Sequence, residues 1–415
     1  MKIDKDELKK ALATAVKFTE RKSMMPVLGC VLVDGEAGKL YATDLEHSCA
    51  IPLKVSDVEK VVSDPDKNAR EEFVAELSEL KVAQLRNLAA DYGIEIPAKG
   101  KGSVIVDAIV VGSTLVKASE TGARLGLNAN SLKRIIDSLD ETGMIEFKEA
   151  PGKVSIGQHF HEIYTMPTDE FPIPFLTTEI VGTVTMKRSD LEKVLPAATI
   201  ADVGFKLSGV YFDKKGDLAI TTDGHRLHMA SAKVLSEKSF QVSTQFFKKL
   251  PHGKEDEELV IEACGNENDV HYARVLSEAG EFTSRVMDTQ FPDYTAVVPK
   301  KSTYSVKVTR KDVMVAIKQG LVMSDARSRA ARLTFNGGID VAVENPDSGK
   351  YDRAKVAMIG HVDPPLTIGL NLKYLVDAMP GKKDDDEFTV ELTDSSHPVI
   401  FRKDTFTALV MPIRV

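Results

Sequence analysis

An internal repeat constrains the fold of this 415-residue chain more than any other feature of its sequence. Three segments begin with a strand-like pair of residues, continue with charged residues and then carry apolar residues at positions i, i+3 or i+4 and i+7. That spacing predicts an amphipathic helix, and the polar face of each helix is rich in Lys and Arg. The three segments are residues 1–12, 186–195 and 306–317.

A second helical segment follows in each repeat, and each begins at a residue suited to an N-cap, namely Asn128, Ser243 or Asn371. Between the two helices of each repeat the sequence predicts a β-hairpin, and each repeat closes with a strand or corner that contains proline. Four kinds of element in one order predict three similar structural units. The second helices lie at 128–139, 243–250 and 371–379, the hairpins at 41–46, 218–230 and 341–347, and the closing segments at 166–173, 286–294 and 410–415.

The first repeat is expected to carry an insertion. About 120 residues separate the starts of the second and third repeats, whereas the starts of the first and second lie about 60 residues further apart. Strand-like alternation is lost after residues 50–55, so we expect the insertion at about 60–120. Within it, residues 77–109 predict a helix, an extended loop and a second helix, with Gly93 ending the first helix.

This insert resembles SAP-like modules and the small N-terminal domain of the Rho terminator, which often bind nucleic acid. The resemblance covers about 35 residues in a region that is rich in Asp and Glu. Two interpretations stay open. The insert is either an additional DNA or RNA contact or a spacer that docks another protein. The basic residues that would make the nucleic-acid contact are Lys81, Arg86, Lys99 and Lys101.

The composition narrows the class of protein. A net charge of −8 argues against a general nucleic-acid binder unless positive and negative charges are segregated on the surface. Apolar and charged contents of 43% and 28% are typical of a soluble globular protein. No apolar run approaches the ~18 residues of a membrane helix, and the charged N-terminus is unlike a signal peptide, so we expect a cytoplasmic protein. The three cysteines, Cys30, Cys49 and Cys264, are expected to be reduced core thiols.

The middle hairpin, residues 218–230, contains the most conspicuous polar residues. Asp223-Gly224 is a strong turn signal, because Gly tolerates positive φ and Asp bonds to its own backbone. His225 and Arg226 follow the turn directly. From the residues alone, His225 is either a turn histidine with a structural role or part of a binding site. Asp223 and His225 as an acid–base pair would need a nucleophile or a metal nearby.

Two further histidines lie close together in the chain. His159 and His161 should share one face of a strand and could bind zinc, but no third or fourth ligand is evident. The other interpretation is a structural edge strand. A metal-dependent hydrolase that uses His159, His161, Asp223 and His225 is therefore an alternative function.

Five short motifs resemble those of one family. Taken together and in order, they are similar to the bacterial sliding clamp, the β subunit of the DNA polymerase III holoenzyme. The resemblance covers essentially the whole chain outside the insertion. The motifs are SMMPVL at 23–28, ATDLE at 42–46, TTDGHRL at 221–227, QFPDY at 290–294 and MPIRV at 411–415.

The resemblance implies an α+β DNA-clamp fold with three topologically similar domains, at 1–175 with the insertion, 176–300 and 301–415. Two protomers would close head to tail into a ring around double-stranded DNA of any sequence. The homodimer would be a non-catalytic processivity factor without a cofactor, and it would tether the replicative DNA polymerase. An ATP-dependent clamp loader, other polymerases and repair proteins would be its further partners, the latter through a clamp-binding peptide. A clamp-like regulator that does not encircle DNA is a second alternative.

The resemblance also implies three sets of functional residues. The cations expected to face DNA are Lys9, Lys10, Lys17, Arg21, Lys22, Lys133, Arg134, Lys187, Arg188, Lys193, Lys248, Lys249, Arg310, Lys311 and Lys318. The residues expected to form the partner-peptide pocket are Leu207, Thr222, Gly224, His225, Arg226, Leu227, Pro292, Val297, Pro398, Leu409, Met411, Pro412, Ile413 and Arg414. The residues expected at the dimer interface are His161, Ile163, Val322 and Met323.

Overall fold

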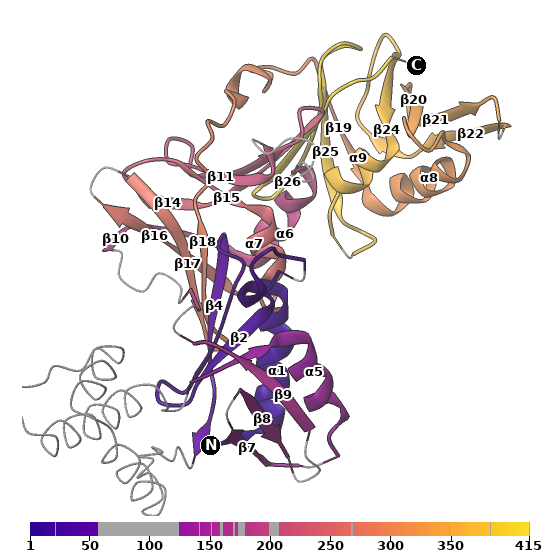
Figure 1. Ribbon diagram of the computed structural model, residues 1–415. Coiled ribbons are helices and arrows are strands. Elements are labelled where there is room, and N and C mark those ends of the chain that lie inside the picture. The colour runs from indigo at the N-terminus through magenta and orange to yellow at the C-terminus, as the bar shows by residue number, and fades with distance from the viewer. Residues whose placement is uncertain are drawn as a thin grey trace, which may run out of the picture. The chain divides into compact units, whose positions relative to one another are not determined.

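The computed structural model forms two compact units, Met1–Pro174 and Phe175–Val415, which we describe one at a time (Figure 1). The described residues are 1–20, 22–56, 124–140, 142–150, 152–157, 161–168, 171–172, 179–198, 207–266, 269–347, 349–381 and 383–414. The expected insertion, its module at 77–109, Arg21 and His159 lie outside these residues. No helix among the described residues is both long enough and apolar enough to cross a membrane.

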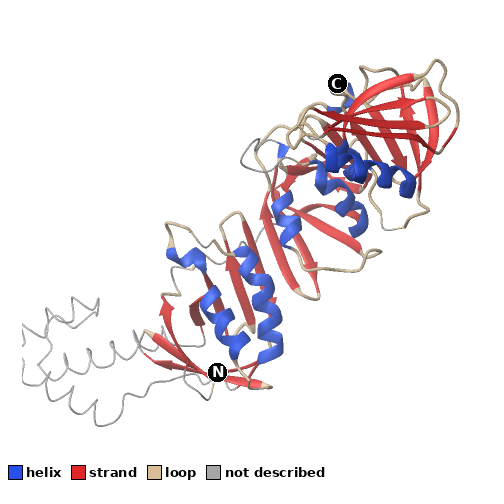
Figure 2. Ribbon diagram, turned by 90° about the vertical axis from the view of Figure 1, so that its right-hand side faces the viewer, coloured by secondary structure: helices blue, strands red, loops and turns tan. Residues whose placement is uncertain are grey.

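The first unit consists of antiparallel strands covered by a pair of helices (Figure 2). Helices α1 (Lys5–Ala15) and α5 (Ala129–Ser138) pack against each other and bury Leu8, Leu12, Leu132 and Ile136. The neighbour order of the strands is β4-β3-β2-β6-β9-β8-β7-β1-β5. Their bounds are β1 Lys2–Asp4, β2 Cys30–Asp34, β3 Lys39–Thr43, β4 His47–Pro52, β5 Val55–Ser56, β6 Arg124–Asn128, β7 Met144–Ala150, β8 Lys153–Ile156 and β9 His161–Met166.

The first part of the second unit repeats this succession of elements. A long strand leads directly into α6 (Arg188–Val194), and β15 (Phe240–Ser243) leads into α7 (Thr244–Lys249). Strands β14, β10, β16, β17 and β18 are neighbours in that order. The remaining bounds are β10 Glu179–Lys187, β11 Gly209–Asp213, β12 Leu218–Thr222, β13 Arg226–Ser231, β14 Lys233–Ser236, β16 Glu258–Asn266, β17 Asp269–Ser277 and β18 Gly280–Arg285.

The second part of this unit contains α8 (Arg310–Met323) and α9 (Leu372–Ala378), each again preceded directly by a strand. In the described residues, β22, β21, β20 and β24 form a four-stranded sheet in that order. The bounds are β19 Tyr304–Thr309, β20 Ala330–Phe335, β21 Ile339–Asn345, β22 Gly349–Val356, β23 Met358–Ile359, β24 Leu366–Asn371, β25 Glu387–Leu392, β26 Val399–Lys403 and β27 Phe406–Val410.

A nine-stranded sheet joins the two parts of the second unit. Its order in the described residues is β15-β11-β12-β13-β27-β26-β25-β19-β23. The junction is the antiparallel pair β13–β27, in which Arg226 lies opposite Val410 and Leu227 opposite Leu409. The middle hairpin and the C-terminal strand, far apart in the sequence, therefore lie side by side.

The repeat extends to individual hydrogen bonds. The first residue of α1, α6 and α8 is a cation whose side chain donates to a carbonyl at the end of the second helix of the same repeat. Lys5 donates to Leu139, Arg188 to Pro251 at 3.2 Å and Arg310 to Met379 at 3.0 Å. Carbonyls at a helix C-terminus lack intrahelical partners, and cations stabilise them. These three cations therefore join the two helices of each repeat.

Several local predictions are confirmed. Asn128, Ser243 and Asn371 are N-caps whose side chains accept hydrogen bonds from backbone N–H groups in the first turn of α5, α7 and α9. Cys30, Cys49 and Cys264 are buried, and none of these three described cysteines forms a disulfide. The assignment of three clamp domains with boundaries at 175/176 and 300/301 stays a prediction.

Candidate functional site

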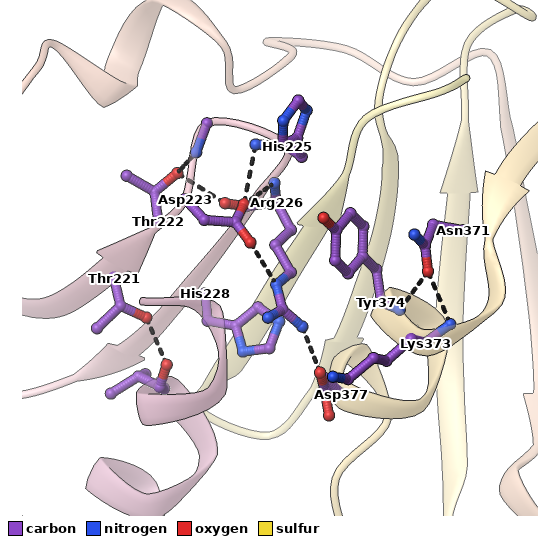
Figure 3. A network of polar contacts seen from close by, with 12 residues as sticks. Thr221, Thr222, Asp223, His225, Arg226, His228, Asn371, Lys373, Tyr374 and Asp377 are labelled. Atoms are coloured by element: carbon purple, nitrogen blue, oxygen red, sulfur yellow. Dashed lines mark hydrogen bonds and ion pairs between the residues drawn. The ribbon is translucent and has the colours of Figure 1, made fainter. Parts of the chain in front are cut away.

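The tight turn between β12 and β13 is closed by its own side chains (Figure 3). The Asp223 carboxylate accepts hydrogen bonds from the backbone N–H groups of His225 at 2.9 Å and Arg226 at 3.0 Å. The Thr222 hydroxyl accepts from Gly224 N–H and donates to the Arg226 carbonyl at 2.7 Å. Gly224 has φ +86°, which glycine adopts without steric cost. The predicted turn is confirmed, and the Asp223 carboxylate serves to hold it.

The guanidinium of Arg226 is held from several sides. Its Nε donates to Asp223 Oδ2 at 3.0 Å, and its Nη1 donates to Asp377 on α9. The ring centroid of Tyr374, also on α9, lies 4.5 Å from Cζ, which is cation–π geometry. Arg226 is only 9% exposed. The charged group of Arg226 therefore already binds two carboxylates inside the protein, and its place in the partner-peptide pocket stays a prediction.

His225 and Tyr374 present two rings beside this buried cation. Their centroids lie 6.4 Å apart, and the ring planes differ by 16°. His225 is exposed, whereas Tyr374 is half-buried. Burial, and after it the negative charge of Asp223, raises the pKa of the Tyr374 phenol. The pair places two nearly parallel rings beside the turn, and the Tyr374 hydroxyl stays protonated at neutral pH.

The C-terminal tail runs past the same turn. The backbone N–H of Met411 donates to the His225 carbonyl at 2.8 Å, and that of Ile413 donates to the Gly369 carbonyl on β24 at 2.8 Å. Met411, Pro412 and Ile413 are half-buried, and Arg414 is exposed. These two hydrogen bonds hold the tail between the β12–β13 turn and β24, so it borders the surface next to His225.

An apolar floor lies on the face of β13 opposite the side chain of Arg226. Leu227 and Leu409 are part of a buried cluster on β12, β13, β26 and β27, against which the half-buried side chains of Phe291 and Tyr294 pack. The members of the buried cluster are Ile220, Leu227, Met229, Ile400 and Leu409.

The segment between β18 and β19 is anchored onto this floor. Phe291 stacks on Tyr211 with centroids 4.6 Å apart and planes 1° apart. The Tyr294 hydroxyl donates to Asp213 Oδ2 at 2.8 Å, and burial, followed by the carboxylate of Asp213, raises the pKa of Tyr294. Pro292 and Val297 lie on this segment and are exposed. Two aromatic anchors thus present two exposed apolar side chains close to the floor.

The expected pocket residues therefore fall into groups. The turn residues, the floor residues and the tail residues are brought together by β13–β27 pairing and by the Met411–His225 hydrogen bond. Pro398 directly precedes Val399, the strand partner of Val410, which places it at the same end of the sheet as Met411. Leu207 is half-buried, and its place in the pocket stays a prediction.

Comparison with known proteins finds one consistent similarity. Residues 295–414 match the family model described as the DNA polymerase III beta subunit, C-terminal domain. The chain is 25% identical over 324 residues to the beta sliding clamp of Pseudomonas putida, covering 74% of this chain and 86% of that protein. It is 26% identical over 319 residues to the beta sliding clamp of Synechococcus elongatus, covering 71% of this chain and 83% of that protein. Residues 295–414 thus match a beta-subunit domain, and the chain is similar to bacterial beta sliding clamps over most of their length.

Solved clamp structures share its fold. The DNA polymerase III subunit beta of Pseudomonas aeruginosa superimposes with a TM-score of 0.73 at 21% identity, covering 100% of this chain and 99% of that chain. The beta subunit of Thermotoga maritima gives a TM-score of 0.72 at 20% identity, with coverages of 100% and 99%. The α+β clamp fold expected from the sequence is confirmed.

Most of the cations expected to face DNA lie on the surface, but Arg188 does not. It is 8% exposed; its Nε donates to Glu257 at 2.9 Å and its Nη1 to the Pro251 carbonyl. Burial and these two hydrogen bonds argue against a direct phosphate contact by Arg188. Arg310 is half-buried in the corresponding bond to Met379. The exposed members are Lys9, Lys10, Lys17, Lys22, Arg134, Lys187, Lys248, Lys311 and Lys318.

The residues expected at the dimer interface also differ in their exposure to solvent. Val322 at the end of α8 is 80% exposed, and its neighbour Met323 is half-buried. Ile163, by contrast, is 7% exposed and pairs across strands with the buried Val154. Alternation along β9 directs Ile163 into the core of its own unit. Ile163 is therefore a core residue of its own unit, which argues against a direct interface contact. His161 on the same strand is half-buried.

Sequence reasoning missed Tyr374 and Asp377. Both lie on α9 and are three positions apart, so they occupy one face of the helix. The sequence predicts this helix, but its acidic and aromatic side chains give no sign of their partner on β13. The alternative metal site is not supported by neighbouring ligands: in the part of the chain that the structure describes, no group of three or more His, Cys, Asp or Glu side chains could hold a metal ion. His159 lies outside that part.

Proposed function

We propose that this protein is a DNA sliding clamp that tethers a replicative DNA polymerase to its template. The observation that carries this proposal is similarity to curated beta sliding clamps over 86% and 83% of their length, combined with the clamp fold. The protein would act by topological linkage rather than by catalysis, and it would require no cofactor.

The active form would be a head-to-tail homodimer of three-domain protomers, with domains at 1–175, 176–300 and 301–415. Paired helices such as α1 and α5 would line the hole. Exposed lysines and arginines on them would attract phosphates without contacting base edges, which suits movement along any sequence. The net charge of −8 does not exclude such a local positive surface, because the local arrangement of charges sets the local field. Two acidic stretches, 255–258 and 384–387, contact the first residues of α6 and α8, where Asp384 lies 3.9 Å from the Lys311 ammonium.

Partner proteins would dock as a short peptide beside the β12–β13 turn. The floor around Leu227 and Leu409 would bury apolar anchors, while the rings of His225 and Tyr374 and the flexible side chain of Met411 would form the rim. The replicative polymerase, other polymerases and repair proteins, and the ATP-dependent clamp loader would share this groove, as expected for a surface that adapts to several partners. The protein would work in the cytoplasm.

A loading assay tests the function. The protein, mixed with the clamp loader encoded by the same genome and ATP, is loaded on nicked circular DNA and separated from free protein by gel filtration. We expect it to remain with the circle and to be released when a restriction enzyme linearises the DNA. Equal retention on circular and linear DNA would overturn the proposal, and so would a protein that light scattering shows to be monomeric only.

A further inference from the structure

Asp377 and Tyr374 reach from α9 across the junction to the turn that follows β12. They are neighbours on one helix face, and both contact the guanidinium of Arg226 (Figure 3). Arg226 and Asp377 are 151 positions apart in the chain. This contact is the place where the second helix of the last repeat touches the polar end of the candidate groove.

Asp377 forms a partly buried ion pair with Arg226 rather than a solvent-exposed one. The side chains of Arg226, Asp223 and Asp377 are 9%, 14% and 23% exposed, so water screens this cluster only in part. A guanidinium is always charged, and the removal of one partner of a buried ion pair leaves an uncompensated charge. Asp223 is also engaged by two backbone N–H groups of the turn. Asp377 is therefore the carboxylate that ties this turn to another part of the fold.

The contact between Asp377 and Arg226 affects the groove because Arg226 is linked to the turn and to the C-terminal tail. The backbone of Arg226 pairs with Val410, and the adjacent His225 carbonyl accepts the N–H of Met411. The ring of Tyr374 lies over the guanidinium on one side of this connection and runs nearly parallel to the exposed ring of His225. Any shift of Arg226 would move the turn, the start of the tail and the two rings together.

We infer that Asp377 is a positioning residue for partner peptides: by holding Arg226, it fixes the relative placement of His225, Tyr374 and the tail at the polar end of the groove. Asp377 need not touch the peptide for this. The inference rests on the proposed docking of partners in this groove, and it assigns the control of groove geometry to a helix outside the β12–β13 hairpin.

The test compares Asp377→Asn with wild type in the full-length protein. The probe is a fluorescein-labelled synthetic peptide that copies the C-terminal residues of the replicative polymerase encoded by the same genome, and the readout is fluorescence anisotropy. We expect Asp377→Asn to weaken binding about tenfold. This is less than the roughly 30-fold or more seen when a charge pair buried inside an interface loses one partner, because Asp377 acts on the groove only through Arg226. Asp385→Asn is the matched control, because Asp385 is exposed on the loop after α9 and the charge change is the same. Its affinity should equal that of wild type.

A double-mutant cycle separates positioning from a general reduction of stability. If Asp377 acts through Arg226, the combination of Asp377→Asn with Arg226→Lys should weaken binding by much less than the product of the two single effects. Asp377→Glu, which keeps the carboxylate, should restore most of the affinity. Amide hydrogen exchange at residues 223–227 should be faster in Asp377→Asn than in Asp385→Asn, and this measurement needs no peptide.

Each outcome points to a different conclusion. No binding of the probe by wild-type protein would overturn the proposed groove itself. Binding by wild type with equal affinity in Asp377→Asn and Asp385→Asn would overturn this inference alone. Multiplicative effects in the cycle, or a lower melting temperature of Asp377→Asn with unchanged exchange at the turn, would also overturn it.

Discussion

Nη1 of Arg188, the first residue of α6, donates to the carbonyl of Pro251 just after α7, at 3.2 Å, while its Nε binds Glu257 at 2.9 Å. The side chain that the family resemblance assigned to DNA thus joins the two helices of one repeat. Lys5 and Arg310 occupy the same place in the other repeats. Position on a basic helix face is therefore not sufficient to assign a DNA contact.

Replacement of Arg188 should affect stability rather than DNA binding. Arg188→Met keeps an unbranched apolar side chain but leaves the Pro251 carbonyl and Glu257 without this donor. We expect the free energy of unfolding to fall by about 1–3 kcal/mol, the usual cost when a buried hydrogen bond is deprived of one partner. Thermal unfolding measures it, with Lys187→Met, at an exposed neighbour, as the control. An unchanged melting temperature in Arg188→Met would contradict the structural role.

Replacement of the exposed cations should affect DNA binding rather than stability. Lys10 on α1 and Arg134 on α5 are both on the surface. Lys10→Ala combined with Arg134→Ala should weaken binding to linear duplex DNA and flatten its dependence on salt, by about 0.9 in the log–log slope for each phosphate that is no longer neutralised. Titrations at several salt concentrations check this. The slope of Arg188→Met should match wild type, and a flatter slope in that variant would argue that Arg188 does reach phosphate.

Deletion of residues 411–415 should abolish binding of a polymerase tail peptide. The tail borders the turn through the Met411–His225 hydrogen bond, and the deletion removes its half-buried apolar side chains from the rim of the groove. The strand pair β13–β27 remains, so the ring should still assemble. Anisotropy with the labelled peptide and light scattering measure the two properties. Unchanged peptide affinity would refute the assigned groove.

Val322 and Ile163 should give different results when mutated. Val322→Asp places a charge on a residue that is 80% exposed in the single chain, so it should leave the protomer folded and shift the dimer toward monomer in light scattering. Ile163→Ala creates a cavity in the first unit and should lower its stability by about 2–5 kcal/mol. A dimer that persists in Val322→Asp at low protein concentration would exclude Val322 from the interface.

Tyr294 predicts a dependence of stability on alkaline pH. Burial and the Asp213 carboxylate raise its pKa in the folded protein above the ordinary value of about 10. The stabilisation is therefore complete below pH of about 10 and is lost as the pH rises toward the folded-state pKa, since the unfolded phenol ionises first. Tyr294→Phe removes this contribution, so its melting temperature should fall less than that of wild type as the pH is raised through about 10. Parallel curves for both proteins would contradict the assignment.

Short-range features of the fold could be predicted from the sequence. Asn128, Ser243 and Asn371 are identifiable as N-caps because a side chain that bonds to the next turn depends on neighbours two or three positions away. The turn at Asp223-Gly224 follows from the same kind of short-range chemistry. The repeat and its helices could be found because hydrophobic periodicity reflects which face of an element is buried.

Which polar side chains are free to act could not be predicted in this way. Arg188, Arg226 and Ile163 have the residue type and the position expected of contact residues, but each is buried. Their partners lie on other helices or strands, as Asp377 does for Arg226. A local sequence pattern cannot predict a contact between residues 151 positions apart. The helices and strands, the repeat and the family resemblance could therefore be predicted from the sequence. The placement of Arg226 between Asp223 and Asp377 required the folded chain, because packing settles whether a charge meets water or another charge.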